Sequence, residues 1–164
     1  MTDLHAVKFV DGSDLLVRGL GMPYGGPMGG RDLEGEFFSA KTDFMFDFIG
    51  GERPLLYDHG LDDTVGPLVH GRVVEYKRTD DGVWTIAQLD RRARYLQEIQ
   101  ELVSRGILSF SSGAYPYFAQ VNKSTGEIER WPWVELSLTP TPMNPYAVAS
   151  KSLRESLRIP LQPD

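Results

Sequence analysis

Turn-forming residues interrupt this chain at short intervals and limit the length of any helix or strand that it can form. Seventeen glycines and eleven prolines are distributed among 164 residues. This frequency favours a β-rich or mixed fold over a helical bundle. The length and the 41% hydrophobic content are typical of one globular domain with its own core. We therefore expect a folded α+β domain over residues 1–150, followed by a helix end and tail over 151–164.

Hydrophobic periodicity predicts a β-rich, barrel-like sheet with flanking helices. The clearest helix covers 91–105, with Asp90 as the cap of its start and Gly106 as its end. Shorter helices are expected at 42–48 and 146–157. The predicted strands are 7–10, 15–20, 55–58, 66–77, 83–89, 107–120 and 128–139. Residues 21–30 hold five glycines and two prolines, which indicates a flexible loop rather than a strand.

Charge and residue types exclude several classes of function. The net charge of −6 repels phosphate backbones, so no nucleic-acid partner is expected. Without cysteine, the chain has neither disulfides nor thiolate nucleophiles. Its three histidines lack the His-x-x-x-His spacing of zinc enzymes, and we expect no metal or other cofactor. No signal peptide and no apolar run of membrane-spanning length is present, so no membrane association is expected.

A serine two residues before a glycine follows the predicted central helix: Ser111, in the run SFSSGA (109–114). A serine hydroxyl becomes a nucleophile only when a base takes its proton. His59 is a candidate base and Glu135 a candidate carboxylate partner. Serine, histidine and carboxylate form hydrolase triads that are defined by geometry and not by chain order. The alternative for Glu135 is an ion pair with an arginine: Arg72, Arg105 or Arg130.

Side-chain alternation along a strand places the neighbouring serines, Ser111 and Ser112, on opposite faces. Ser109 and Ser111 should share one face of their strand, while Phe110 and Ser112 share the other. If Phe110 points into the core, Ser112 is partly buried and Ser111 faces outward. Ser111 is therefore the preferred nucleophile. A bulge near Gly113 would reverse this order, so Ser112 and Ser109 stay open as alternatives.

Six segments, in their order along the chain, resemble the prohead protease family of tailed bacteriophages, which is related to the herpesvirus maturational protease, assemblin. Together they extend over residues 55–147, more than half of the chain. The segments are PLLYDHG (54–60), VHGRVV (69–74), DDGVW (80–84), ELVSRG (101–106), LSFSSG (108–113) and VELSLTPTPMNPYA (134–147).

The resemblance implies a herpesvirus-protease-like fold and a role for each candidate residue. It implies that Ser111 is the nucleophile, His59 the general base and Glu135 the group that orients His59. The herpesvirus relatives use a second histidine as the third member, so His70 is the alternative to Glu135. Those relatives also build part of the oxyanion hole with an arginine loop. Here no Arg or Lys follows Ser111 until Lys123, and backbone N–H groups near Gly113 are the expected donors.

The resemblance also implies a biological role. The expected function of the 1–150 domain is a serine endopeptidase of capsid maturation. Its substrates would be the scaffold protein, the scaffolding region of the major capsid protein, or itself. Self-association and a location in the host cytoplasm, inside the immature capsid, are implied as well. The alternatives are a catalytically silent capsid-assembly protein of the same fold, or an esterase, although the Gly-x-Ser-x-Gly elbow of esterases is missing.

Overall fold

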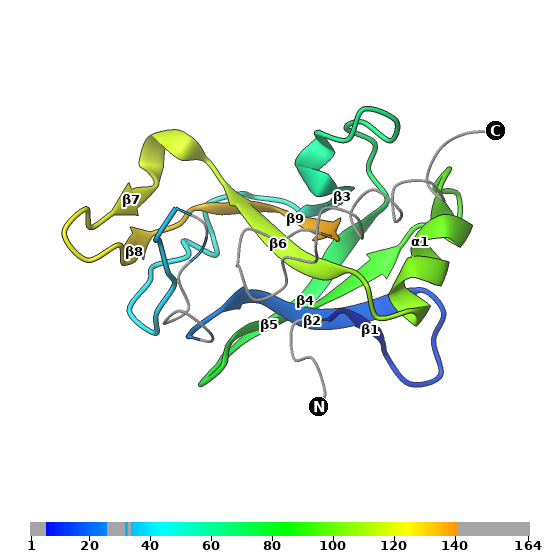
Figure 1. The fold of residues 1–164 in the computed structure, drawn as a ribbon, viewed down its shortest axis with the longest axis horizontal. Helices are drawn as coiled ribbons and strands as arrows, with labels where there is room; N and C mark the ends of the chain where they lie inside the picture. Colours follow the sequence, from blue (N-terminus) through cyan, green and yellow to red (C-terminus); the bar gives the residue numbers. More distant parts are fainter. Residues whose placement is uncertain (1–5, 26–31, 33, 141–164) are drawn as a thin grey trace.

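The computed structural model describes residues 6–25, 32 and 34–140. This part forms one seven-stranded sheet curled into a half-barrel, a two-stranded ribbon and one α-helix (Figure 1). The sheet order is β1-β2-β5-β4-β3-β9-β6. Its strands are β1 (Lys8–Phe9), β2 (Leu16–Pro23), β3 (Pro54–Tyr57), β4 (Gly71–Thr79), β5 (Gly82–Leu89), β6 (Ser109–Ala114) and β9 (Trp133–Thr139). The predicted α+β class with a barrel-like sheet is confirmed.

The two outer strands of the sheet approach each other and enclose the core. Ala6, just before β1, forms a bridge with Ser109 at the start of β6. The Val7 N–H donates to the Leu108 carbonyl at 2.7 Å. The curled sheet surrounds large, fully buried side chains, among them Trp133, Tyr57, Phe44, Met22 and Leu55. Burial of such apolar groups stabilises the half-barrel.

β3 and β9 are parallel, whereas the other neighbouring strands of the sheet are antiparallel. Leu56 lies beside Ser137, and Tyr57 lies beside Leu138. Parallel strands end at the same edge of a sheet, so the turn Asp58–Gly60 after β3 lies against β9 (Figure 1). The Thr139 hydroxyl donates to Asp58 Oδ1 at 2.9 Å and fixes the turn there.

The helix α1 (Leu96–Ser104) begins five residues later than the sequence predicts. Asp90 does not cap it: the Asp90 carboxylate accepts from the Arg92 N–H at 2.9 Å and closes a separate turn. Tyr95 occupies the N-cap position instead. The predicted end is confirmed, because Gly106 adopts a φ of 71°, which glycine tolerates best. The buried face of α1 consists of Ile99, Leu102 and Val103.

Several local predictions are wrong. β2 continues to Pro23, into the predicted loop, and Gly21 lies where a Cβ would come within 2.7 Å of Thr85 Oγ1. Glycine is therefore needed there for packing within a strand. The predicted helix at 42–48 is not formed: Asp43 makes a β-bridge with Arg130, and Met45 has a φ of 47°, which lies outside the helical region.

The two long C-terminal strands are each divided. A 3-10 turn, Pro116–Phe118, separates β6 from β7 (Gln120–Val121). Pro132 lies between β8 (Ile128–Arg130) and β9. Proline has no N–H to donate to a neighbouring strand, which explains both breaks. β7 and β8 form the ribbon. The predicted helix at 146–157 and the tail at 151–164 lie outside the described residues.

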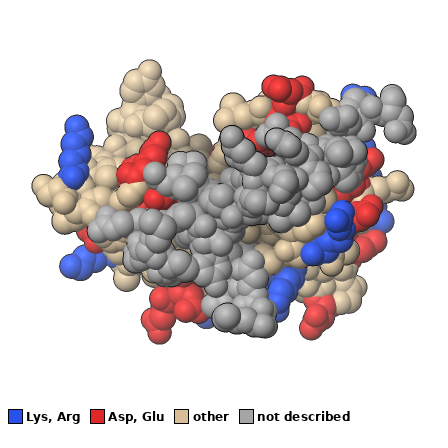
Figure 2. All heavy atoms as spheres, in the orientation of Figure 1, with Lys and Arg blue, Asp and Glu red and all other residues tan. Residues whose placement is uncertain are grey.

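Charged side chains of both signs are interspersed on the face seen in Figure 2. The chain as a whole carries a net charge of −6. Within the described residues, no helix has the length and hydropathy needed to cross a membrane.

Candidate active site

One face of the β6–β9 pair is polar, and it carries two of the three predicted site residues. Ser111 lies directly opposite Ser137, and Gly113 lies opposite Glu135. Paired residues project to the same side of a sheet, as do residues two apart on one strand. Ser111, Glu135 and Ser137 therefore share this face. The opposite face enters the core through Phe110, Leu136 and Leu138.

His59 reaches this polar face from a strained turn. Asp58, His59 and Gly60 are consecutive left-handed residues, with φ angles of 50°, 56° and 76°. For residues other than glycine, this conformation costs about 1–2 kcal/mol each. The His59 N–H donates to Ser137 Oγ at 2.9 Å, which ties the turn to β9. The turn thus holds the imidazole over the β6–β9 pair.

A continuous chain of hydrogen bonds joins the three predicted residues. His59 Nε2 lies 2.9 Å from Ser111 Oγ. His59 Nδ1 lies 2.5 Å from Glu135 Oε1. The second carboxylate oxygen, Oε2, accepts from the Ser137 hydroxyl at 2.9 Å. The structure therefore brings Ser111, His59 and Glu135 together in the order serine–imidazole–carboxylate.

The charge on Glu135 controls the proton affinity of His59. Burial by itself lowers the pKa of His59, but the hydrogen bond and negative charge of Glu135, with a contribution from Asp58, more than offset it. The net result is a pKa above the ordinary value of 6.5. The pair stabilises the fold most at a pH below the ordinary pKa, and this contribution is lost as pH rises through the raised pKa.

The two alternative serines, Ser109 and Ser112, take no part in this series of hydrogen bonds. Both ring nitrogens of His59 are occupied, by Ser111 and Glu135. Ser112, on the opposite face of β6, accepts from Trp131 Nε1 at 3.0 Å, and Ser109 lies opposite Thr139. The predicted alternation and the partial burial of Ser112 are confirmed, but the predicted exposure of Ser111 is wrong. Ser111 is only 9% exposed, because the His59 turn lies over the face that carries it.

His70 does not take the place of Glu135. Its side chain is 1% exposed and packs near Tyr95, with ring centroids 6.4 Å apart. Among the described residues, neither ring nitrogen of His70 has a hydrogen-bonding partner. Burial lowers the pKa of His70, because the charged ring would lose its hydration. These features indicate a packing role for His70.

The Glu135 carboxylate bonds to His59 and Ser137. The alternative prediction, an ion pair between Glu135 and an arginine, is therefore not what the structure shows. Arg72, one of the three candidate arginines, pairs with Glu52 instead. The Glu135 side chain is 15% exposed, so these bonds also satisfy a charged group that is mostly removed from water.

Sequence reasoning missed the contributions of two residues to the site. Gly113 leaves the space through which the Glu135 side chain passes: a Cβ at this position would overlap the carboxylate. Ser137 bonds both to the backbone of His59 and to the carboxylate of Glu135. Ser137 could have been predicted from the sequence, because it follows Glu135 by two residues and so lies on the same face of the strand.

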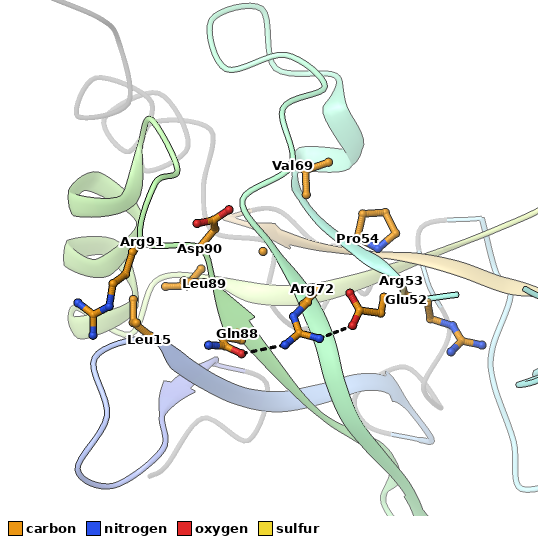
Figure 3. Close-up of a pocket in the computed structure, with 11 residues that line it drawn as sticks. Leu15, Glu52, Arg53, Pro54, Val69, Arg72, Gln88, Leu89, Asp90 and Arg91 are labelled. Atoms are coloured by element: carbon orange, nitrogen blue, oxygen red, sulfur yellow. Dashed lines mark hydrogen bonds and ion pairs between the residues drawn. The ribbon is translucent and has the colours of Figure 1, made fainter. Parts of the chain in front are cut away.

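A pocket of about 480 Å³ lies away from this site, at the start of β3 and beside β4 and β5 (Figure 3). Figure 3 shows Arg72 between Glu52 and Gln88, with interactions to both. Arg72 and Glu52 are largely exposed, and such surface pairs contribute little stability. None of the three predicted site residues lines this pocket. It is therefore separate from the candidate active site.

The arrangement at Ser111 has the components of nucleophilic catalysis. Imidazole Nε2 can accept the hydroxyl proton, and the carboxylate at Nδ1 fixes the tautomer and stabilises the imidazolium. The described residues contain no cluster of three or more His, Asp or Glu side chains suited to a metal ion. Comparisons with protein-family models, curated proteins and solved structures found no match to the chain.

We expect Glu135→Gln to lower the pKa of His59 below its ordinary value. Without the carboxylate charge, burial becomes the dominant influence on the imidazole. NMR titration of the ring protons measures this shift, and His70 provides an internal reference. In the wild type, the rate at which Ser111 reacts with a fluorophosphonate should rise with pH through the raised pKa of His59. An unchanged His59 titration in the variant would contradict the pairing.

We expect Gly113→Ala to displace the Glu135 carboxylate and to slow the reaction of Ser111 with a fluorophosphonate by about tenfold or more. Glycine at this position has no positive φ, so the loss would come from the added Cβ and not from backbone strain. Gly50→Ala is the matched control, since its added Cβ meets nothing within 4 Å. Equal rates in the two variants would show that Gly113 has no such role.

Proposed function

We propose that this protein is a serine endopeptidase of phage capsid maturation that cleaves the scaffold protein, the scaffolding region of the major capsid protein, or itself. The observation that carries the chemistry is the bond sequence Ser111 Oγ–His59 Nε2 and His59 Nδ1–Glu135 Oε1, at 2.9 and 2.5 Å. The substrate class rests on the sequence resemblance over residues 55–147. The same resemblance, together with the curled sheet, supports a herpesvirus-protease-like fold.

In the proposed mechanism, His59 Nε2 takes the proton of the Ser111 hydroxyl while the oxygen attacks the carbonyl carbon of the scissile peptide bond. The tetrahedral intermediate collapses when His59 returns this proton to the leaving amine and the C–N bond breaks. A water molecule then attacks the acylated Ser111, with His59 as base. The acid product leaves, and the serine recovers its proton. Glu135 holds the imidazolium through Nδ1–H in both halves.

Backbone N–H groups near Gly113 stabilise the oxyanion in this mechanism. One such donor contributes about 100-fold or more in rate. No cofactor enters this mechanism. The proposed partners are the capsid or scaffold protein and further copies of the chain. The proposed location is the interior of the immature capsid in the host cytoplasm.

The proposal is tested by labelling with a fluorophosphonate, followed by peptide mapping of the adduct. We expect one adduct, on Ser111, and we expect His59→Ala to slow its formation by about 100-fold or more. Ser112→Ala is the matched control, because it removes the neighbouring hydroxyl on the opposite face. This control should react at close to the wild-type rate.

Cleavage assays then identify the substrate. Active protein should cut the scaffold region of the capsid protein from the same phage, and Ser111→Ala should not. Hydrolysis of small esters without cleavage of that polypeptide would indicate an esterase. Absence of any adduct in free and capsid-associated protein would contradict the proposal and favour a silent capsid-assembly protein.

A further inference from the structure

We propose that Ser137 is a fourth member of the site: a positioning residue that locks the backbone of His59 and the carboxylate of Glu135 into one arrangement. Its effect on catalysis rests on the proposed hydrolase function. Its effect on the His59–Glu135 pair does not depend on that function, and the two can be measured separately.

The Ser137 hydroxyl makes two hydrogen bonds, one in each direction. It donates to Glu135 Oε2 at 2.9 Å and accepts from the His59 N–H at 2.9 Å. A hydroxyl has one proton to donate, and here the carboxylate receives it. Ser137 is 0% exposed, so water cannot readily replace either bond. One buried group thus contacts both the base and the group that orients the base.

The bond to Glu135 directs the carboxylate. A glutamate side chain has three rotatable bonds, and a carboxylate held at one oxygen alone can turn away from the imidazole. Ser137 holds Oε2 while His59 holds Oε1. With both oxygens bonded, the Glu135 carboxylate has a fixed orientation, and Oε1 points toward Nδ1 of His59. Loss of the Ser137 anchor should weaken the His59–Glu135 bond.

The bond to the His59 N–H stabilises an unfavourable backbone conformation. His59 has a φ of 56°, in the left-handed region that non-glycine residues rarely adopt. Such conformations persist when surrounding contacts hold them in place. Ser137 holds the turn at His59, and Thr139, two residues further along the same strand face, holds it at Asp58. The polar face of β9 therefore positions the base as well as its carboxylate.

Ser137→Ala tests this inference through two readouts. We expect the pKa of His59 to fall, as followed by NMR titration, because the carboxylate that raises it is less well placed. We also expect reaction of Ser111 with a fluorophosphonate to slow by about 10- to 100-fold, the range of one hydrogen bond to a charged group. Ser112→Ala is the control for loss of a nearby serine hydroxyl: it removes one hydrogen bond, of 3.0 Å, whereas Ser137→Ala removes two.

Two more variants separate positioning from loss of folding. Ser137→Thr keeps the hydroxyl and should restore the His59 titration and most of the rate. If Ser137→Ala does not fold, Ser137→Cys replaces it, because a thiol is a weaker donor and should give an intermediate shift and rate. A His59 titration identical to wild type, with rates equal to those of Ser112→Ala, would overturn the inference.

Failure of the proposed function would look different. If the wild type forms no adduct but Ser137→Ala still shifts the His59 titration, the hydrolase proposal fails and the positioning role of Ser137 stands. If the wild type reacts and Ser137→Ala neither slows it nor shifts the titration, the hydrolase proposal stands and the positioning role fails.

Discussion

The parallel pairing of β3 with β9 is the contact on which the candidate site depends. It brings the turn after β3 against the strand that carries Glu135 and Ser137. Antiparallel pairing of β9 with β6 then adds Ser111 from the other side. His59 thus meets Ser111, 52 residues further along the chain, and Glu135, 76 residues further along. The candidate site therefore depends on the order of the strands in the sheet, and loss of the β3–β9 pairing would separate His59 from Ser111 and Glu135.

Side-chain alternation on β6 and β9 divides apolar from polar roles within a few residues. Leu136 and Leu138 anchor β9 in the core, while Glu135, Ser137 and Thr139 face the turn. The apolar half makes the strand rigid, and the polar half uses that rigidity to position side chains. Gly113 completes the arrangement by leaving space for the carboxylate. Gly113 and the Ser137 hydroxyl, both near Ser111, thus help to position the Glu135 carboxylate.

Much of this could be predicted from local patterns. Alternation assigned Ser109 and Ser111 to one face, and residue types together with a family resemblance selected His59 and Glu135. The long-range features could not be predicted in this way. β3 has four residues, too few to reveal its neighbour, and nothing local specifies parallel pairing with β9. The burial of Ser111 and the left-handed φ of His59 depend on that pairing, and so does the role of Ser137. The late start of α1 reflects a turn at Asp90 that competes with helix capping.

The central claim is that Glu135 acts on Ser111 only through His59. A double-mutant cycle tests this most directly, with the rate of fluorophosphonate reaction at Ser111 measured for wild type, His59→Ala, Glu135→Ala and the double variant. We predict that the double variant reacts within about threefold of His59→Ala, because removal of the base leaves the carboxylate nothing to orient. If the two single losses multiply in the double variant, the residues act independently and the account is contradicted.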